Sequence, residues 1–332
     1  MRCMPAGRQL QLDDSCEVRW ESMSETSAHA PSCTKCSARA IFYQPYSGMH
    51  LCARHFVLDV ERKVKRRLRK SRAIERGDRI AIALSGGKDS SSVLMMLSKL
   101  TEHRRDVELV AIAVDEGIAG YRAHTLDVAR RIARQCDVPL EVVSFKNEYG
   151  TTLDELMRDG KGACTYCGVL RKRLLNITAR RLGATKLATG HNLDDEAQSV
   201  LLNHLKGDVE RLCRMRPIRY KEGLIPRIKP LSDVPERETA LYAHLHGIEL
   251  EGPTCPYAER SYRFTLKRML NELEYEHPGT KYALLRGYER LMELVPREPF
   301  ELARCSACGE PSVGHLCKAC ELLSHVMGSD TL

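Results

Sequence analysis

The chain has 332 residues with 43% hydrophobic and 29% charged side chains, enough to bury one sizeable core plus one or two small modules. Lys and Arg outnumber Asp and Glu by 52 to 44, which gives a net charge of +8. No apolar run approaches a membrane span, and the polar residues 1–32 lack the apolar core of a secretion signal. We therefore expect a cytoplasmic protein without membrane contact, with a disordered tail over 1–32.

The first chemical motif is a set of two closely spaced ligand pairs in an expected N-terminal zinc-binding module at 33–60. The chain holds 14 cysteines, many of them in CxxC pairs, and without a secretion signal such pairs favour metal binding over disulfides. His50 is an alternative ligand, but it breaks the paired spacing. The ligands expected for this first zinc ion are Cys33, Cys36, Cys52 and His55.

Cations dominate the next segment, a basic linker at 61–78 on a helix expected from about Arg54 to Glu75. Nearly every residue between Arg62 and Lys70 is Lys or Arg, and further basic groups lie within 171–181 and 211–229. A solvated helix face explains any one of these groups. Three of them in one chain favour a polyanion partner, a nucleic acid.

The central part of the sequence, 79–300, is expected to form one catalytic domain. Short apolar runs alternate there with amphipathic helical patterns, which predicts an α/β fold with a doubly wound parallel sheet and helices on both faces. The expected strands are 79–84, 107–114, 140–145 and 185–189. The expected helices are 89–103, 120–137, one from about 151, 168–182, 193–206, 236–246, 258–276 and 280–294, with a basic docking loop near 207–235.

The loop at 85–90, Ser-Gly-Gly-Lys-Asp-Ser, joins the first strand of this domain to its helix. Glycines let the backbone turn sharply, and the free N–H groups of a helix start attract an anion. Asp115 and Gly190 end other strands at the same edge of the sheet, where such folds bind ligands. The loop resembles the SGGxDS signature of PP-loop ATP pyrophosphatases, which implies ATP as the ligand. The expected ATP-binding residues are Ser85, Gly86, Gly87, Lys88, Asp89, Ser90, Asp115 and Gly190.

Three acids, Asp194, Asp195 and Glu196, open the helix that follows Gly190. The helix macrodipole favours acids in a first turn, which accounts for them without any chemistry. They also flank the expected ATP crevice, where a carboxylate could coordinate Mg2+ or accept a proton. Asp195 is our first candidate for a catalytic group and Asp194 the second.

A separate cysteine set consists of Cys164 and Cys167, just before a predicted helix, and the distant Cys255. Three thiolates are one short of a closed zinc site. They are either a redox pair with an unrelated cysteine, or the three ligands of a [4Fe-4S] cluster whose fourth iron stays open. Cys136 lies on an amphipathic helix and Cys213 in a basic loop, and neither is assigned to this set.

The last module, expected at 301–325, carries two CxxC pairs separated by eight residues. This pattern predicts a second structural zinc ion. His315 lies inside the pattern and is expected to be a bystander. Both modules are too small to fold on apolar burial alone, so metal binding should stabilise them. The expected ligands of the second zinc ion are Cys305, Cys308, Cys317 and Cys320.

Taken together, the motifs SGGKDS at 85–90, CTYCG at 164–168, GHNLDDEA at 190–197 and CP at 255–256 resemble the PP-loop tRNA 2-thiolation enzymes of the TtuA and TtcA type. The resemblance implies that ATP activates O2 of a tRNA uridine and that a cluster on the three cysteines delivers sulfur to C2. An older scheme makes the cysteines persulfide carriers instead. The resemblance also implies a homodimer, and sulfide or a thiocarboxylated ubiquitin-like protein as sulfur donor.

The target uridine is suggested by Arg171, which stands where T-loop enzymes of this type commonly carry lysine. Archaeal and eukaryotic wobble-uridine enzymes tend to have arginine there, so the wobble position is favoured and the T-loop position is the alternative. Arg171 and Lys172 are expected to bind RNA phosphate. Two other readings are a PP-loop amide ligase, for which no glutaminase-like segment is visible, and a non-catalytic, zinc-stabilised RNA-binding protein.

Overall fold

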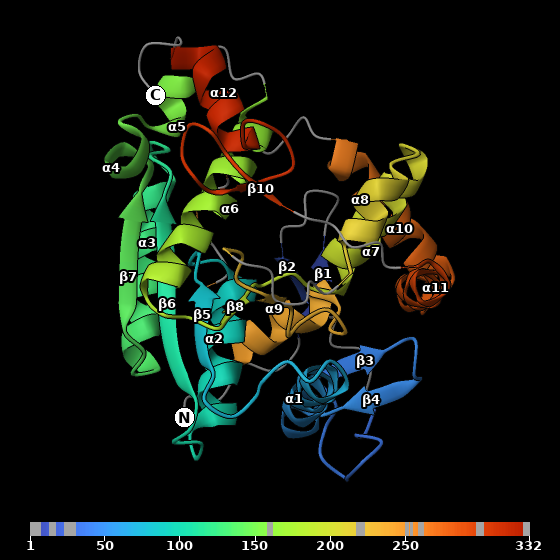
Figure 1. The fold of residues 1–332 in the computed structure, drawn as a ribbon. Helices are drawn as coiled ribbons and strands as arrows, with labels where there is room; N and C mark the ends of the chain where they lie inside the picture. The colour runs from blue at the N-terminus through green and yellow to red at the C-terminus, as the bar shows by residue number, and fades with distance from the viewer. Residues whose placement is uncertain are drawn as a thin grey trace.

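The computed structural model describes residues 8–12, 18–22, 31–157, 162–216, 223–249, 252, 255–257, 262–296 and 302–327, with the backbone alone for 8–12, 18–22 and 325–327. In this part of the chain, five parallel strands form the central sheet in the order β7-β6-β5-β8-β9 (Figure 1). The predicted doubly wound α/β sheet is therefore confirmed. The strands are β5 Arg79–Ala83, β6 Glu108–Asp115, β7 Leu140–Ser144, β8 Lys186–Ala188 and β9 Arg227–Ile228.

Alternation along the strands builds a hydrophobic core on each face of the sheet, because successive strand side chains point to opposite sides. On β5, Ile80 and Ile82 contribute to one core with the first set of helices, whereas Ala81 contributes to the other core with the second set. The first set is α1 Ala53–Lys70, α2 Lys88–Thr101, α3 Arg122–Gln135 and α9 Glu236–Leu245. The second set is α4 Phe145–Tyr149, α5 Leu153–Leu156, α6 Ala163–Arg181 and α12 Lys318–Met327.

A third group of helices packs beside the sheet around its own small core, in which Leu193, Val200 and Leu285 are buried. Its members contact one another through α7, which follows β8 (Figure 1). The members are α7 Leu193–Leu205, α8 Val209–Arg214, α10 Tyr262–Glu276 and α11 Thr280–Leu294. The expected helices 193–206 and 280–294 are found at nearly these bounds, and the 258–261 start expected for the helix 258–276 lies outside the described residues.

Three expectations for the domain need correction. Helix α6 begins at Ala163, so the CTYCG motif lies inside its first turns rather than before it. The helix expected from about 151 is the short α5, which a Thr152–Glu155 capping box starts, and an additional short helix that was not predicted, α4, precedes it and ends at Gly150 with φ +71°. The docking loop expected at 207–235 contains α8 and the edge strand β9, while 217–222 lie outside the described residues.

Small antiparallel strand pairs stand at both ends of the chain. Within the tail expected to be disordered, β1 Arg8–Leu12 pairs with β2 Val18–Ser22. The N-terminal metal-ligand module contains β3 Phe42–Gln44 and β4 Met49–Leu51, and the C-terminal one contains β10 Ala303–Arg304 and β11 Pro311–Ser312. Helix α1 runs across the 60/61 boundary expected between module and linker. Among the described residues, no helix is long and apolar enough to span a bilayer.

Candidate ATP and thiol site

The loop at 85–90 crosses from β5 to α2 where the strand order changes direction, between β5 and β8. Gly86 has φ +86°, and a Cβ atom there would lie 1.9 Å from the Thr125 carbonyl oxygen. A Cβ atom on Gly190, in the loop after β8, would lie 2.8 Å from the Ser90 backbone nitrogen. Gly86 therefore lets the loop pack on α3, and Gly190 lets the two loops pack on each other, so that the predicted phosphate loop lies at the switch point between adjacent strands.

Hydrogen bonds between the two ends of the loop fix its conformation. The Ser85 backbone N–H donates to the Ser90 hydroxyl at 3.1 Å, and the two serine hydroxyls lie 3.0 Å apart. Lys88 pairs with Asp89 at 3.1 Å and with Glu236 of α9 at 3.0 Å. Burial opposes the charge of Lys88, but these two carboxylates raise its pKa above the ordinary value. Lys88 thus stays protonated within the loop, where its charge can bind a phosphate.

Asp195 lies at the same edge, held by a reciprocal capping box with Asn192. The Asn192 side-chain amide also donates to Asp89 at 3.1 Å, which joins the helix start to the phosphate loop. Burial, and then the negative charge of Asp89, raise the pKa of Asp195 to about 6. Such a carboxyl group can exchange a proton near neutral pH. Asp115 lies at the end of β6, where its Oδ1 accepts from the Gly117 backbone N–H at 2.9 Å.

Asp194 is placed differently from its neighbour. It is buried, accepts from the Glu236 backbone N–H at 2.7 Å and forms an ion pair with Lys281. These contacts tie the start of α7 to α9 and α11, which is a structural task. The catalytic role suggested for Asp194 stays a prediction, and none of these contacts supports it.

Two residues that the sequence motifs did not single out join the ATP loop to the thiols. Glu116 and Arg122 are both buried, and the Arg122 Nε atom lies 2.9 Å from a Glu116 carboxylate oxygen. The Arg122 guanidinium also donates to the Ser85 carbonyl at 2.8 Å. The second Glu116 oxygen lies 3.4 Å from Nη1 of Arg171, whose charge acts on Cys167. The only sequence signal for Glu116 is its position directly after Asp115 at a strand end.

The three cysteines come together from distant parts of the chain. Cys164 and Cys167 lie in the first turns of α6, and the Cys164 thiol lies 3.4 Å from the carbonyl oxygen of Tyr257, two residues after Cys255. Burial raises the pKa of Cys167 to about 11, and the neighbouring thiols Cys255 and Cys164 act in the same direction. Among the described residues, no fourth ligand joins this trio to make the compact four-ligand group that one small ion requires. Three gathered thiols without a fourth ligand fit a larger, open cluster.

Several cations lie near Arg171, the arginine whose charge acts on Cys167. Lys172 of α6 and Arg227 of β9 have no ion pair with a carboxylate among the described residues, and Arg263 of α10 donates to the Asp195 carbonyl at 3.3 Å. Burial, and then the charges of Arg227 and Arg171, lower the pKa of Lys172. Positive charges held together in this way are stabilised when an anion binds between them.

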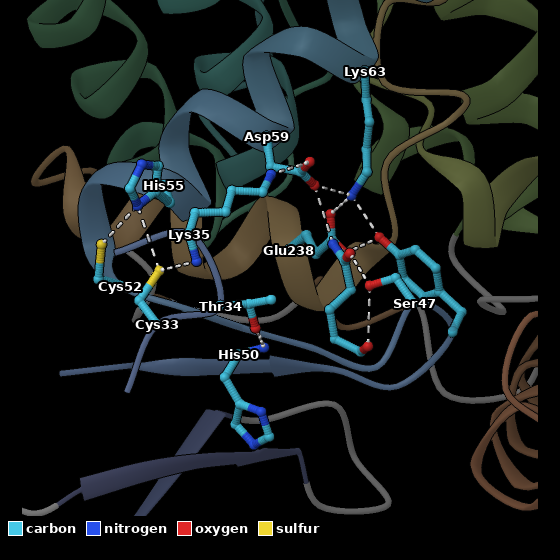
Figure 2. Close-up of polar contacts among 12 residues, drawn as sticks. Cys33, Thr34, Lys35, Ser47, His50, Cys52, His55, Asp59, Lys63 and Glu238 are labelled. Atoms are coloured by element: carbon cyan, nitrogen blue, oxygen red, sulfur yellow. Dashed lines mark hydrogen bonds and ion pairs between the residues drawn. The ribbon is translucent and has the colours of Figure 1, made fainter. Parts of the chain in front are cut away.

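The N-terminal ligand group forms as predicted. Cys33, Cys36, Cys52 and His55 place one donor atom each within 4.8 Å of the others. The His55 ring lies 3.4 Å from the sulfurs of Cys33 and Cys52, whereas His50 points away from the group (Figure 2). Although burial opposes it, backbone N–H groups including that of Lys35 lower the pKa of Cys33 to about 6, which favours the thiolate that binds a metal.

A buried polar network connects this module to the catalytic domain (Figure 2). Lys63 of α1 lies 2.9 Å from Asp59 and also pairs with Glu238 of α9. Gln44 of β3 donates to Asp59 at 3.1 Å and to Glu238 at 3.0 Å. Glu238 is two residues from Glu236, which contacts Lys88 of the ATP loop. No local sequence motif predicts that these residues contact one another, because the contacting residues are up to 194 positions apart.

The C-terminal group also gathers. Its four predicted cysteines lie within 4.8 Å of one another, and His315 is not among them. The Cys317 backbone N–H contacts the Cys305 sulfur at 3.2 Å. Although burial opposes it, such backbone contacts lower the pKa of Cys305 to about 6. Cys305 and Cys317 belong to the same core as α6, so this module is anchored to the helix that carries the thiols.

Comparison with known proteins agrees with this arrangement. A family model described as a PP-loop domain matches residues 58–271, and one described as the N-terminal LIM domain of 2-thiouridine synthetase TtuA matches residues 32–57. The tRNA 2-thiolation protein NcsA of Haloferax volcanii is 38% identical over 316 residues, covering 89% of this chain and 98% of that protein. Cytoplasmic tRNA 2-thiolation protein 1 of Bos taurus is 37% identical over 304 residues, covering 89% and 87%.

A solved structure is similar as well. The U34-tRNA thiolase NcsA from Methanococcus maripaludis, determined with its [4Fe-4S] cluster, superposes with a TM-score of 0.80 at 34% identity, covering 90% of this chain and 97% of that one. The fold and site thus define a PP-loop protein. More narrowly, the chain belongs to the family of tRNA 2-thiolation proteins, and the predicted resemblance is confirmed.

Proposed function

We propose that this protein is an ATP-dependent tRNA uridine 2-sulfurtransferase that acts on the wobble uridine in the cytoplasm. The observation that carries the proposal is the continuous chain Ser85–Arg122–Glu116–Arg171, which links a phosphate loop to three gathered thiols. An enzyme that activates a base with ATP and then delivers sulfur needs both sites within reach of one atom. Lys172 and Arg227, which have no ion pair with a carboxylate among the described residues, suit an RNA substrate, and the U34 named for the Methanococcus maripaludis structure favours the wobble position.

In the first step, uridine O2 attacks the α-phosphorus of ATP, and the bond to the leaving pyrophosphate breaks. The 85–90 loop and Lys88 would hold the phosphates, Asp89 could hold Mg2+, and Asp195 would accept the proton. In the second step, sulfide forms a bond to C2, and AMP leaves with the original oxygen. No net oxidation or reduction is required.

We assign the thiol trio to a [4Fe-4S] cluster, which would supply an open iron that binds sulfide near the activated carbon. Cys164, Cys167 and Cys255 would be its ligands, since they gather without a fourth. Around them Arg171 and Lys172 would orient an RNA phosphate. Free sulfide or a thiocarboxylated ubiquitin-like protein would be the donor, and the active form would be a homodimer.

Both four-ligand groups are proposed to hold zinc, which gives an expected metal content of two zinc ions per chain. Changing Cys305 to Ser should reduce that content to one, because three ligands cannot close the site. Element-specific mass spectrometry of purified protein measures it. Cys136→Ser is the matched control and should keep two ions, since Cys136 lies outside both groups. Two ions retained in Cys305→Ser would contradict the assignment.

Asp195 sets an expected pH dependence. Its raised pKa of about 6 means that the carboxyl group is neutral below that pH and ionised above it. A proton acceptor must be ionised, so tRNA-dependent pyrophosphate release should fall about tenfold per pH unit below pH 6 and level off above pH 7. Asp195→Asn keeps the capping geometry and should be slow with no acid limb. Asp208→Asn, also at a helix start, should behave like the wild type; an acid limb that survives in Asp195→Asn would rule out this role.

The function is tested by mass spectrometry of tRNA nucleosides from a strain that lacks the protein. Loss of 2-thiouridine from the anticodon, restored by the wild-type gene, is the expected result. Loss confined to the T-loop would establish the alternative target. Unchanged thiouridine, together with no tRNA-dependent AMP release in vitro, would overturn the proposal and favour a non-catalytic RNA-binding protein.

A further inference from the structure

The cations of α1 are divided between two sides of the helix. Lys63 and Arg67 turn inward, where Lys63 pairs with Asp59 and Glu238, and Arg67 contacts Glu289 at 2.6 Å. These two positions are committed to holding α1 against α9 and α11. The remaining cations of the run, apart from Lys70, lie exposed with no ion pair to a carboxylate among the described residues. They are Arg62, Lys65, Arg66 and Arg69.

These four residues, called the α1 stripe below, follow the spacing i, i+3, i+4, i+7 and therefore share one side of the helix. At a rise of 1.5 Å per residue the stripe extends over about 10 Å. Together with Leu58, Glu61 and Lys70, which also lie on α1, it lines an open, shallow surface along this helix. A row of unneutralised charge along one helix repels itself, so an occupant of opposite charge stabilises it.

We propose that the α1 stripe binds phosphates of the tRNA backbone as a docking surface separate from the cations near the thiol trio. The inference rests on the proposed function and adds a second contact area for the same substrate. The cations near the thiol trio come from α6, β9 and α10, whereas α1 packs on α9 and β4 (Figure 1). An extended RNA can bridge two such areas, and backbone contacts of this kind fix its register while the chemistry takes place elsewhere.

The composition of this surface favours RNA over an acidic protein. Leu58 is the single apolar residue among those that line it in the described part of the chain. Protein interfaces usually have an apolar centre that is depleted in lysine. This surface has no such apolar centre among the described residues. Phosphate backbones instead select Lys and Arg and release counterions on binding, which gives a steep dependence on salt.

The test is a salt titration of tRNA affinity with an unmodified wobble-uridine transcript. Arg62→Ala/Arg66→Ala removes two contacts, so the slope of log K against log salt should become shallower by about 1.4 to 1.8, which corresponds to an affinity loss of about 25- to 60-fold at 0.1 M salt relative to 1 M. Arg130→Ala/Arg131→Ala is the matched control, because it removes two exposed cations from α3 with the same change in net charge. Arg62→Lys/Arg66→Lys should retain most of the wild-type slope.

Equal losses in the stripe variant and the α3 control would show that net charge alone matters and would overturn the proposal. A stripe variant that binds tRNA like the wild type would also overturn the proposal. The same holds if that variant loses only the binding of an acidic protein. The proposed function fails separately: a protein without thiolation activity whose tRNA binding still depends on the stripe would refute the activity and leave this inference standing.

Discussion

Changing Cys255 to Ala is expected to lower 2-thiouridine formation by at least about 100-fold, since a cluster ligand matters at least as much as the residues that orient one. Cys255 is remote in sequence, yet the Cys164 thiol contacts the same short segment at Tyr257. The anaerobically purified variant should lose the brown colour and iron–sulfur absorption of the wild type. Nucleoside mass spectrometry and the ultraviolet–visible spectrum measure the two effects.

Cys213→Ala is the control for this result. Cys213 is a partly buried cysteine that packs against the α7–α11 core and is not part of the trio. It should leave both colour and activity unchanged. A colourless wild-type protein with full activity would refute the cluster and favour persulfide chemistry on the paired cysteines.

The second large effect is expected at Glu116, which lies between two arginines in the interior. Changing it to Ala leaves Arg122 buried without its partner, which costs about 3–5 kcal/mol in free energy of unfolding. Because Arg122 also holds the Ser85 carbonyl, ATP affinity should fall in the variant that still folds. Denaturant unfolding and ATP titration measure the two quantities. Glu116→Gln keeps the shape and should retain more stability than Ala.

Glu141 of β7 offers the matched comparison, since it forms an exposed ion pair with Arg181 of α6 at 2.6 Å. Its change to Ala should alter the free energy of unfolding by about 0–1 kcal/mol, because solvent screens such pairs. If both alanine variants lose the same stability, the buried bridge has no special importance. If ATP affinity is unchanged in Glu116→Ala, the link to the phosphate loop is absent.

Local patterns predicted much of this molecule. The loop between Ala83 and Lys88 and the paired cysteines depend on residues close together in the sequence, so spacing was enough to place them. The sheet followed from apolar alternation. The start of α6 was wrong because Cys and Thr are only moderately unfavourable in helices, so the motif could continue the helix past its expected beginning.

Long-range partners were not predictable in the same way. The contacts of Glu116 with Arg171 and of Gln44 with Glu238 depend on the tertiary fold, which brings distant parts of the chain together. The edge strand β9 was missed because two residues carry no periodicity, and its pairing with β8 depends on tertiary packing. Sequence reasoning found the candidate site residues more easily than the residues that hold them in place.

Helix α9 makes the N-terminal module inseparable from the enzyme. One turn of this helix presents Glu236 to the ATP loop and Glu238 to the Lys63 network. A shortened protein that begins after the module would lose Gln44 and Asp59 and leave Glu238 with fewer partners in the interior. Any lineage that discarded the module would therefore have to redesign α9, so the two parts are expected to be inherited as one unit.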